Sequence, residues 1–303
     1  MDDERPGSGT AIIGNMSIKV LNEEKLNSRL WRLTVRAEAV AGTDLAVHVL
    51  LPEGWSARRE WPLLTLHHGG LDDSSSWIRH TDVEALSRDR GVLVAMPDGG
   101  RAGGYADWRR GPRWQTFHVH HLHALMRERY GAGPVRAVAG VSGGGYGALL
   151  GAAANPGTFR YAAALSAPCT IRRALSSVTL LAATGIAGRV NPFAMWGVPV
   201  VHGEHWQAAD PLHLAAGLRG TGLFLSCGLT GRPGPLDPPG PWSAANLAEP
   251  VVRSTVGPFL RRLRALGIPV TAHLYRDGTH SWPYWRRELH RAWPALMRAL
   301  QAP

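Results

Sequence analysis

The stretch that decides the fold is Val135-Arg-Ala-Val-Ala-Gly-Val-Ser-Gly-Gly-Gly-Tyr-Gly-Ala-Leu-Leu150. It reads as a short apolar strand, a serine between glycines, and an Ala/Leu-rich helix. This is the G-x-S-x-G nucleophile elbow in its strand–turn–helix context, where a strained turn lifts the serine hydroxyl above a sheet. Side chains at Gly140 and Gly144 would collide with the neighbouring strand and helix. The pattern predicts a catalytic Ser142; the competing interpretation is a glycine-rich turn whose serine only caps a helix.

Composition indicates a folded α/β protein. The chain has 303 residues, of which 45% are hydrophobic and 18% charged, so extensive disorder is not expected. The formal net charge is +10, and almost all of the cations are arginines. Such a charge suits an anionic partner, but the arginines are scattered and accompany no nucleic-acid-binding motif. We therefore expect no nucleic-acid partner and read the charge chiefly as compositional bias.

The cysteines and the N-terminus bear on compartment and domain organisation. Cys169 and Cys227 lack metal-type spacing and are expected to be buried thiols. The first residues are acidic and polar, without the basic and apolar regions of a signal peptide, and no long apolar stretch suggests a membrane span. We expect a cytoplasmic location, a flexible tail over residues 1–15, and a single domain over residues 16–303.

Strand-like and helical patterns alternate along the chain, which predicts a mostly parallel sheet with helices on both faces. The strand-like runs are Trp31–Val40, Leu45–Leu51, Pro62–His67, Val92–Pro97, Val135–Val141, Phe159–Ser166, Leu223–Cys227 and Val270–Tyr275. The helical patterns are Trp114–Tyr130, the segment after Ser142, Asn246–Leu266 and Trp282–Gln301. The first two strands, joined by Gly42-Thr-Asp44, are expected to form an antiparallel hairpin at one edge of the sheet.

Two segments depart from this alternation. Residues 169–218 hold a helical patch, Ile171–Ile186, followed by a Trp/His/Pro-rich region. We interpret them as a cap-like insertion over the carboxyl ends of the strands; the alternative is a surface excursion with its own small core. The second segment, Gly231–Trp242, is too rich in proline and glycine to form a helix or strand.

A serine nucleophile needs a base, and the base needs an orienting acid, in the chain order Ser, acid, His. His280 follows the last strand directly, which is the required place for the base. The acid should follow the preceding strand, where Asp237 is the first carboxylate. Glu249, near the start of a helix, and Asp210 remain alternatives.

The oxyanion hole needs two backbone N–H groups that face the developing negative charge. The amide of Gly143, directly after the nucleophile, is the first candidate. The second should come from His67-His-Gly-Gly-Leu71, which follows the correct strand and resembles the H-G-G loop of esterases. Gly70 is the expected donor, with Leu71 next; a plain Gly-Gly turn is the alternative.

A histidine cluster lies in one of the helical patterns: His118, His120, His121 and His123. Their spacing could place a pair on one helix face, but no carboxylate or cysteine partner is evident. We expect no metal and no cofactor.

The chain resembles the esterase D and mycolyltransferase (antigen 85-type) branch of the α/β-hydrolases. The resemblance rests on Ala95-Met-Pro-Asp-Gly-Gly100 with Tyr105-Ala-Asp-Trp108, Trp206 with Asp210-Pro211, Cys227-Gly228, and Gly278-Thr-His-Ser-Trp-Pro-Tyr-Trp285. These motifs span about residues 60–290, and the last is highly specific. The resemblance implies an α/β-hydrolase fold, Ser142 as nucleophile, His280 as base, and Gly70 and Gly143 as oxyanion donors. The family acid sits soon after the C-G motif, slightly earlier than Asp237.

The sequence thus predicts a serine esterase or acyltransferase that forms an acyl-enzyme from a small carboxylic ester or thioester. Leu71, Trp77, Trp206 and Trp282 are the candidate substrate-binding residues, although tryptophan is common here and could simply pack in the core. One alternative is an intracellular biosynthetic acyltransferase that uses an anionic acyl carrier. The other is a non-catalytic binding protein with a hydrolase fold.

Overall fold

The computed structural model describes residues 10–13, 16–40, 42–102, 104–173, 182, 185–186 and 188–301. In this part of the chain a ten-stranded sheet has the order β1-β2-β3-β4-β6-β5-β7-β8-β9-β10. The strands are β1 Thr10–Ile13, β2 Met16–Lys25, β3 Leu30–Ala37, β4 Asp44–Leu50, β5 Trp61–His67, β6 Leu93–Pro97, β7 Ala132–Val141, β8 Tyr161–Leu165, β9 Gly222–Gly228 and β10 Thr271–Tyr275.

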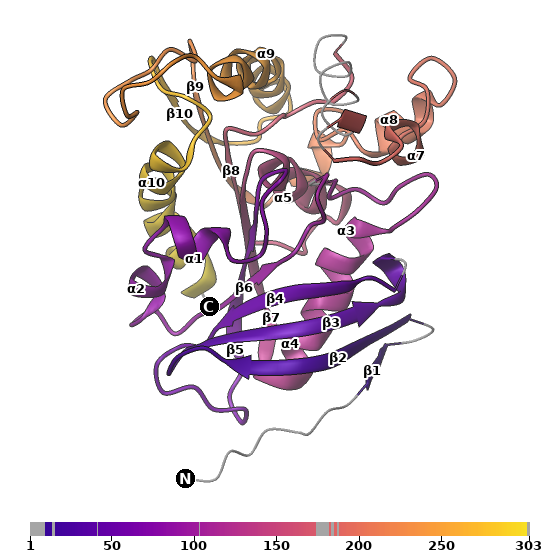
Figure 1. Ribbon diagram of the computed structural model, residues 1–303, viewed down its shortest axis with the longest axis vertical. Helices are drawn as coiled ribbons and strands as arrows, with labels where there is room; N and C mark the ends of the chain where they lie inside the picture. The colour runs from indigo at the N-terminus through magenta and orange to yellow at the C-terminus, as the bar shows by residue number, and fades with distance from the viewer. Residues whose placement is uncertain are drawn as a thin grey trace.

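The type of strand pairing changes once across the sheet. The strands β1 to β4 pair antiparallel, and β4 pairs antiparallel with β6. From β6 to β10 every pair is parallel. The predicted hairpin is therefore confirmed as β3–β4, but its expected place at the edge of the sheet is wrong, because β2 and β1 pair outside β3. The carboxyl ends of β5 to β10 meet at one edge of the sheet. Figure 1 shows the antiparallel strands β2, β3 and β4 stacked at one end of the molecule.

Helices cover both faces of the sheet, as predicted. They are α1 Ser76–His80, α2 Val83–Ser87, α3 Trp114–Thr116, α4 Leu122–Tyr130, α5 Gly143–Ala154, α7 Pro192–Met195, α8 Gly203–Ala208, α9 Ala244–Ala265 and α10 Trp282–Gln301, with the short turns η1 Glu38–Val40, η2 Phe117–His121 and η4 Ala215–Leu218. Along β5, Leu63 packs with α4, whereas Leu64 packs with α10. This alternation is the two-residue period of a strand buried on both faces.

The amino-terminal region differs from the expectation in part. Residues 10–13 of the predicted tail form the edge strand β1, which pairs with β2 from Thr10↔Lys19 to Ile13↔Met16. The strand β2 was not among the predicted strands because its polar stretch, Asn22-Glu-Glu-Lys25, hides the apolar alternation. The rest of the tail lies outside the described residues.

The segment 169–218 leaves the sheet after β8 and returns at β9. Most of its predicted helical patch lies outside the described residues. Trp196 and Trp206 pack with Tyr146 and Leu150 of α5, so the segment shares a small core with the body of the protein. In Figure 1 the helices α7, α8 and α9 lie at the end of the molecule opposite β2.

Candidate active site

Ser142 occupies the sharp turn between β7 and α5. Its backbone has φ 53° and ψ −122°, a conformation that a non-glycine residue adopts only when its surroundings impose it. A Cβ at Gly140 would collide with the carbonyl of Gly144, and a Cβ at Gly144 would collide with the backbone of His67 and His68. The Ser142 side chain makes no capping hydrogen bond to α5. Its hydroxyl is therefore free of the helix-capping role that the competing interpretation gave it.

His280 lies on the loop between β10 and α10, and its ring reaches the serine. The distance from His280 Nε2 to Ser142 Oγ is 2.8 Å. The backbone N–H of His280 donates to the carbonyl of Ala245 (3.0 Å), and its ring meets the face of Trp285 edge-on. These contacts hold the imidazole toward the nucleophile, although the two residues are 138 positions apart in the sequence.

Glu249, on the second turn of α9, is the carboxylate that faces the other nitrogen of the imidazole. Its Oε1 lies 3.8 Å from His280 Nδ1, and the side chain is completely buried. Oε1 also accepts hydrogen bonds from the hydroxyls of Ser166 (2.6 Å) and Tyr275 (3.3 Å). Within the described part of the chain, His280 Nδ1 and Glu249 Oε2 are both buried without a hydrogen-bond partner. The unpartnered Nδ1 of the imidazole thus faces a buried carboxylate, which is the arrangement expected of a base and its orienting acid.

Asp237, the acid first predicted from the sequence, serves another purpose in the structure. Its carboxylate accepts hydrogen bonds from the hydroxyls of Thr279 and Tyr284 and from the N–H of Gly234 (2.8 Å). Burial raises the pKa of Asp237, but these hydrogen bonds outweigh burial and leave the pKa below its usual value. The two carboxylates thus lie differently: Asp237 holds Thr279, the residue before His280, whereas Glu249, one of the predicted alternatives, faces the imidazole. The third candidate, Asp210, accepts from Thr170 and lies in the insertion.

The loop after β5 lies against the elbow. A Cβ on Gly69 would be 3.5 Å from Ser142 Cβ. Leu71 has φ 66°, and its N–H donates to the carbonyl of Arg101 (3.1 Å). Because the Leu71 amide is engaged, the Gly70 amide is the better candidate for an oxyanion donor. The Gly143 amide opens α5 and has no partner within the helix.

The side chain of His68 holds the loop after β5 in place, a role that could not be seen in the sequence. Its Nε2 accepts a hydrogen bond from the Gly99 N–H (2.7 Å), so Nδ1 carries the proton and donates to the Gly69 carbonyl (2.6 Å). The hydroxyl of Tyr105 donates to the His68 carbonyl (2.7 Å). The segment that contains Gly99 and Tyr105, which carries part of the family resemblance, thus supports the candidate oxyanion loop.

The four predicted substrate-binding residues divide into two groups. Leu71 is 62% exposed, and Trp282 borders a cavity of about 480 Å³ that also touches Thr279. Trp77 and Trp206 are 0% and 1% exposed, so in this structure both side chains are buried in the core. Trp77 packs edge-on against Trp282, and Trp206 lies in the core beneath the insertion. A tryptophan can either fill space in the core or contact a ligand, and residue type alone does not show which of these it does.

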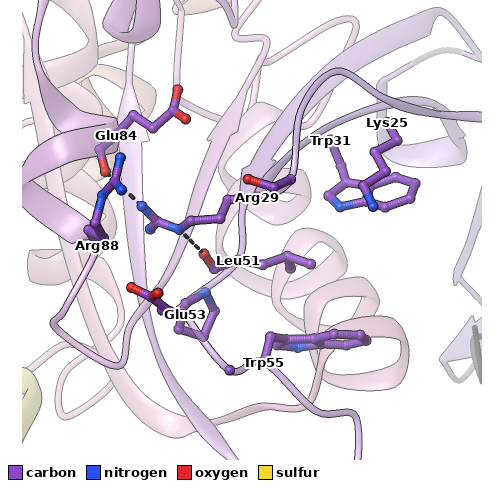
Figure 2. Close-up of a pocket in the computed structure, with 11 residues that line it drawn as sticks. Lys25, Arg29, Trp31, Leu51, Glu53, Trp55, Glu84 and Arg88 are labelled. Carbon is purple, nitrogen blue, oxygen red and sulfur yellow. Dashed lines mark hydrogen bonds between the residues drawn. The ribbon is translucent and has the colours of Figure 1, made fainter. Parts of the chain in front are cut away.

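A separate cavity of about 460 Å³ lies at the amino-end edge of the parallel strands, bordered by the ends of β2 and β4 and by α2 (Figure 2). Arg29 crosses it and donates to the carbonyls of Leu51 and Glu84 (2.8 Å each) and to Ser87 Oγ. Burial lowers the pKa of Arg29. Since these donor groups are engaged by the protein, Arg29 ties β3 to α2, away from the site around Ser142.

The histidine cluster does not converge. His118 lies within hydrogen-bond distance of the carbonyls of Trp114 and Asp98, while His123 lies 3.0 Å from the carbonyl of Gly133. Among the described residues, no group of three or more His, Cys, Asp or Glu side chains is arranged to hold a metal ion. Nor does any helix in this part of the chain have the length and apolar character needed to cross a bilayer. The expected cytoplasmic location stays a prediction.

The sheet order, the helices on both faces and the elbow at Ser142 define an α/β-hydrolase fold. A family model described as "Putative esterase" matches residues 38–296. Esterase Rv1288 of Mycobacterium tuberculosis (strain H37Rv) is 30% identical over 266 residues, which cover 84% of this chain and 57% of that protein. The diacylglycerol acyltransferase/mycolyltransferase Ag85B of Mycobacterium leprae is 32% identical over 244 residues, 76% of this chain and 73% of that protein.

A solved structure shares the fold. MPT51 of Mycobacterium tuberculosis has a TM-score of 0.73 at 21% identity, over 86% of this chain and 96% of that one. The chain belongs to the esterase family of the α/β-hydrolases, in the branch that includes the antigen 85-type mycolyltransferases. It spans 57% of the length of Esterase Rv1288.

Proposed function

We propose that this chain is an ester hydrolase or acyltransferase that forms an acyl-enzyme on Ser142. The observation that carries the proposal is the 2.8 Å distance between His280 Nε2 and Ser142 Oγ, with Glu249 buried on the far side of the ring. A serine hydroxyl becomes an effective nucleophile when an adjacent base can take its proton, and that base needs an oriented tautomer. The names of the relatives, esterase and acyltransferase, support the same class of reaction.

The reaction proceeds in two halves. His280 Nε2 takes the proton of Ser142 as Oγ bonds to the carbonyl carbon, and the oxyanion faces the N–H groups of Gly70 and Gly143. Collapse breaks the bond to the leaving alcohol or thiol, which receives the proton from His280. The carboxylate of Glu249 stabilises the imidazolium meanwhile. Water or an acceptor alcohol then gives its proton to His280 and attacks the acyl-enzyme, and Ser142 regains its hydrogen.

The end of the molecule that carries the site is rich in exposed apolar side chains, which would suit an apolar acyl group. Of the twelve exposed large hydrophobic side chains among the described residues, ten lie on segments that leave the carboxyl ends of the strands. They are Leu71, Ile186, Phe193, Val198, Val200, Val201, Leu229, Leu236, Trp242 and Leu247. Exposed apolar groups gathered at one end of a molecule mark a surface that contacts an apolar ligand or partner.

Fluorophosphonate labelling tests the nucleophile. The wild-type chain should be labelled and Ser142→Ala should not, while Ser254→Ala, on α9, serves as the matched serine control. Labelling of Ser142→Ala would refute the assignment. A p-nitrophenyl ester series of increasing chain length, run with and without acceptor alcohols, then separates hydrolysis from transfer. A wild-type chain that binds these esters without being labelled or turning them over would instead support the binding-protein alternative.

A further inference from the structure

A cavity of about 510 Å³ lies where the start of the insertion meets α9. Basic side chains dominate its lining, with Arg172, Arg173 and His213 on the insertion and Arg262 on α9. The acidic residue in the lining is Asp210, which is 1% exposed. Three exposed arginines against one buried carboxylate give the lining a net positive charge.

The carboxylate of Asp210 is already committed to the protein. It accepts hydrogen bonds from the hydroxyl of Thr170 (2.7 Å) and from the backbone N–H of Leu212 (2.8 Å). In the part of the chain that the structure describes, the guanidinium groups of Arg172 and Arg262 form no ion pair and no hydrogen bond. Asp210 interacts electrostatically with Arg172, but a single carboxylate does not balance three arginines in the lining. A bound anion would offset the remaining positive charge.

The position of the cavity restricts which anion could belong to the substrate. The backbone N–H of Cys169 donates to Thr255 Oγ1 (3.0 Å), which docks the first residues of the insertion along α9. Glu249 and Arg262 are 13 residues apart in that helix, so their backbones lie about 20 Å apart along its axis. If the phosphate were attached directly to the reacting ester, it could not lie in the cavity while the ester lay at Ser142. A phosphate at the end of a long flexible arm could.

We propose that this cavity binds the phosphate of an acyl donor whose thioester and phosphate lie at opposite ends of a phosphopantetheine arm. The inference rests on the proposed function, since it names the donor for that same serine. Guanidinium groups suit phosphate oxygens because their N–H donors form paired, charge-assisted hydrogen bonds. Ser142 attacks the thioester carbon, the C–S bond breaks, and the thiol leaves with the proton from His280. The phosphate keeps the arm in place until the thiol departs.

The test compares the double variant Arg172→Gln/Arg262→Gln with the wild type and with Arg264→Gln, an exposed arginine of α9 outside the cavity. Butyryl-phosphopantetheine and butyryl-pantetheine differ only in the phosphate, and p-nitrophenyl butyrate has neither arm nor phosphate. The wild type and Arg264→Gln should prefer the phosphorylated thioester about tenfold or more in kcat/KM, the effect of one good charge-assisted hydrogen bond. The double variant should lose this preference and keep its activity on p-nitrophenyl butyrate. Butyryl-coenzyme A tests whether the nucleotide adds to the effect.

Equal rates for the two thioesters in the wild type, or a preference that survives in the double variant, would overturn the phosphate site while leaving the esterase proposal intact. Failure of every ester and thioester to react would instead refute the proposed function. The Ser142→Ala protein then decides the phosphate site alone, by calorimetric titration with phosphopantetheine and with pantetheine. Tighter binding of phosphopantetheine, abolished by Arg172→Gln/Arg262→Gln, supports the site; equal binding overturns it.

Discussion

The identity of the catalytic acid is the sharpest point at which the structure can be tested. Replacing Glu249 with glutamine keeps the size of the side chain and removes its charge. The amide can still accept from Ser166, but it cannot stabilise a positive imidazole on the far side. Replacing Asp237 with asparagine makes the matched change in the carboxylate that holds Thr279. The two substitutions therefore separate an electrostatic role from a positioning role.

The expected magnitudes differ widely. Loss of the acid in a serine triad lowers kcat about 10⁴-fold, because the imidazole adopts the wrong tautomer and its cation loses a partner. Since His280 Nδ1 and Glu249 Oε1 are 3.8 Å apart, we expect Glu249→Gln to lower kcat by this amount or somewhat less, about 10³–10⁴-fold. This corresponds to a loss of roughly 4–5.5 kcal/mol of transition-state stabilisation. Asp237→Asn weakens hydrogen bonds of a partly exposed group, so about 1 kcal/mol of stability and less than tenfold in kcat should be lost.

Steady-state hydrolysis of p-nitrophenyl butyrate, with active sites counted by fluorophosphonate titration, gives both values. Thermal unfolding provides the control, because a fall in kcat with an unchanged Tm cannot come from misfolding. If Asp237→Asn loses about 10³-fold while Glu249→Gln stays near the wild type, the carboxylates are assigned the wrong way round and the argument from proximity fails.

Three further substitutions test the supporting structure. Gly144→Ala places a Cβ against the backbone of His68, so urea denaturation should show a loss of about 1–3 kcal/mol, whereas Gly203→Ala, with open space around it, should be nearly neutral. Tyr105→Phe removes the hydrogen bond to the His68 carbonyl and should lower kcat about tenfold with KM little changed; an equal rise in KM would contradict a role in the oxyanion loop. Burial lowers the pKa of His118 to about 4. Between about pH 6.5 and pH 4, this histidine is therefore protonated in the unfolded chain but neutral in the folded chain. Stability present above pH 6.5 should be lost on acidification, by about 2–3 kcal/mol from this residue between pH 7 and pH 4.5, and His118→Gln should flatten the urea-denaturation profile.

Local chemistry made much of the fold predictable from the sequence. The elbow could be recognised because its glycines meet a steric requirement that few other turns share, and the structure shows the collisions that a Cβ would cause at Gly140 and Gly144. The bounds Trp282–Gln301 of α10 were predicted correctly because a strong amphipathic pattern follows the turn at Ser281. The place of His280 was predictable because a loop at the carboxyl end of a parallel strand opens onto the same edge as the elbow.

The facing carboxylate could not be predicted in the same way. Asp237 and Glu249 both follow β9, and chain order alone does not distinguish them. The choice depends on two hydroxyls contributed by other strands, those of Ser166 and Tyr275, which meet Glu249 only after the sheet has formed. Ser166 has φ 48° directly after β8, and no residue pattern in the sequence indicates that strained conformation. Long-range packing of this kind also buried Trp77, which residue type alone left open.

The placement of Glu249 on a helix changes what the neighbouring loop must do. A carboxylate at Asp237 would need the proline-rich segment 231–242 to hold it rigidly in every enzyme molecule, with few backbone hydrogen bonds available to do so. Glu249 is instead held by α9, whose first residues also accept the His280 amide at Ala245, so the same helix fixes both the imidazole and the carboxylate beside it. Asp237 then contributes by fastening the His280 loop through Thr279. On this reasoning segment 231–242 positions the His280 loop but supplies no group that faces the imidazole. Its constrained positions are Asp237 and two glycines, Gly231 and Gly234, where a Cβ would collide with backbone, whereas Leu236 and Trp242 are exposed.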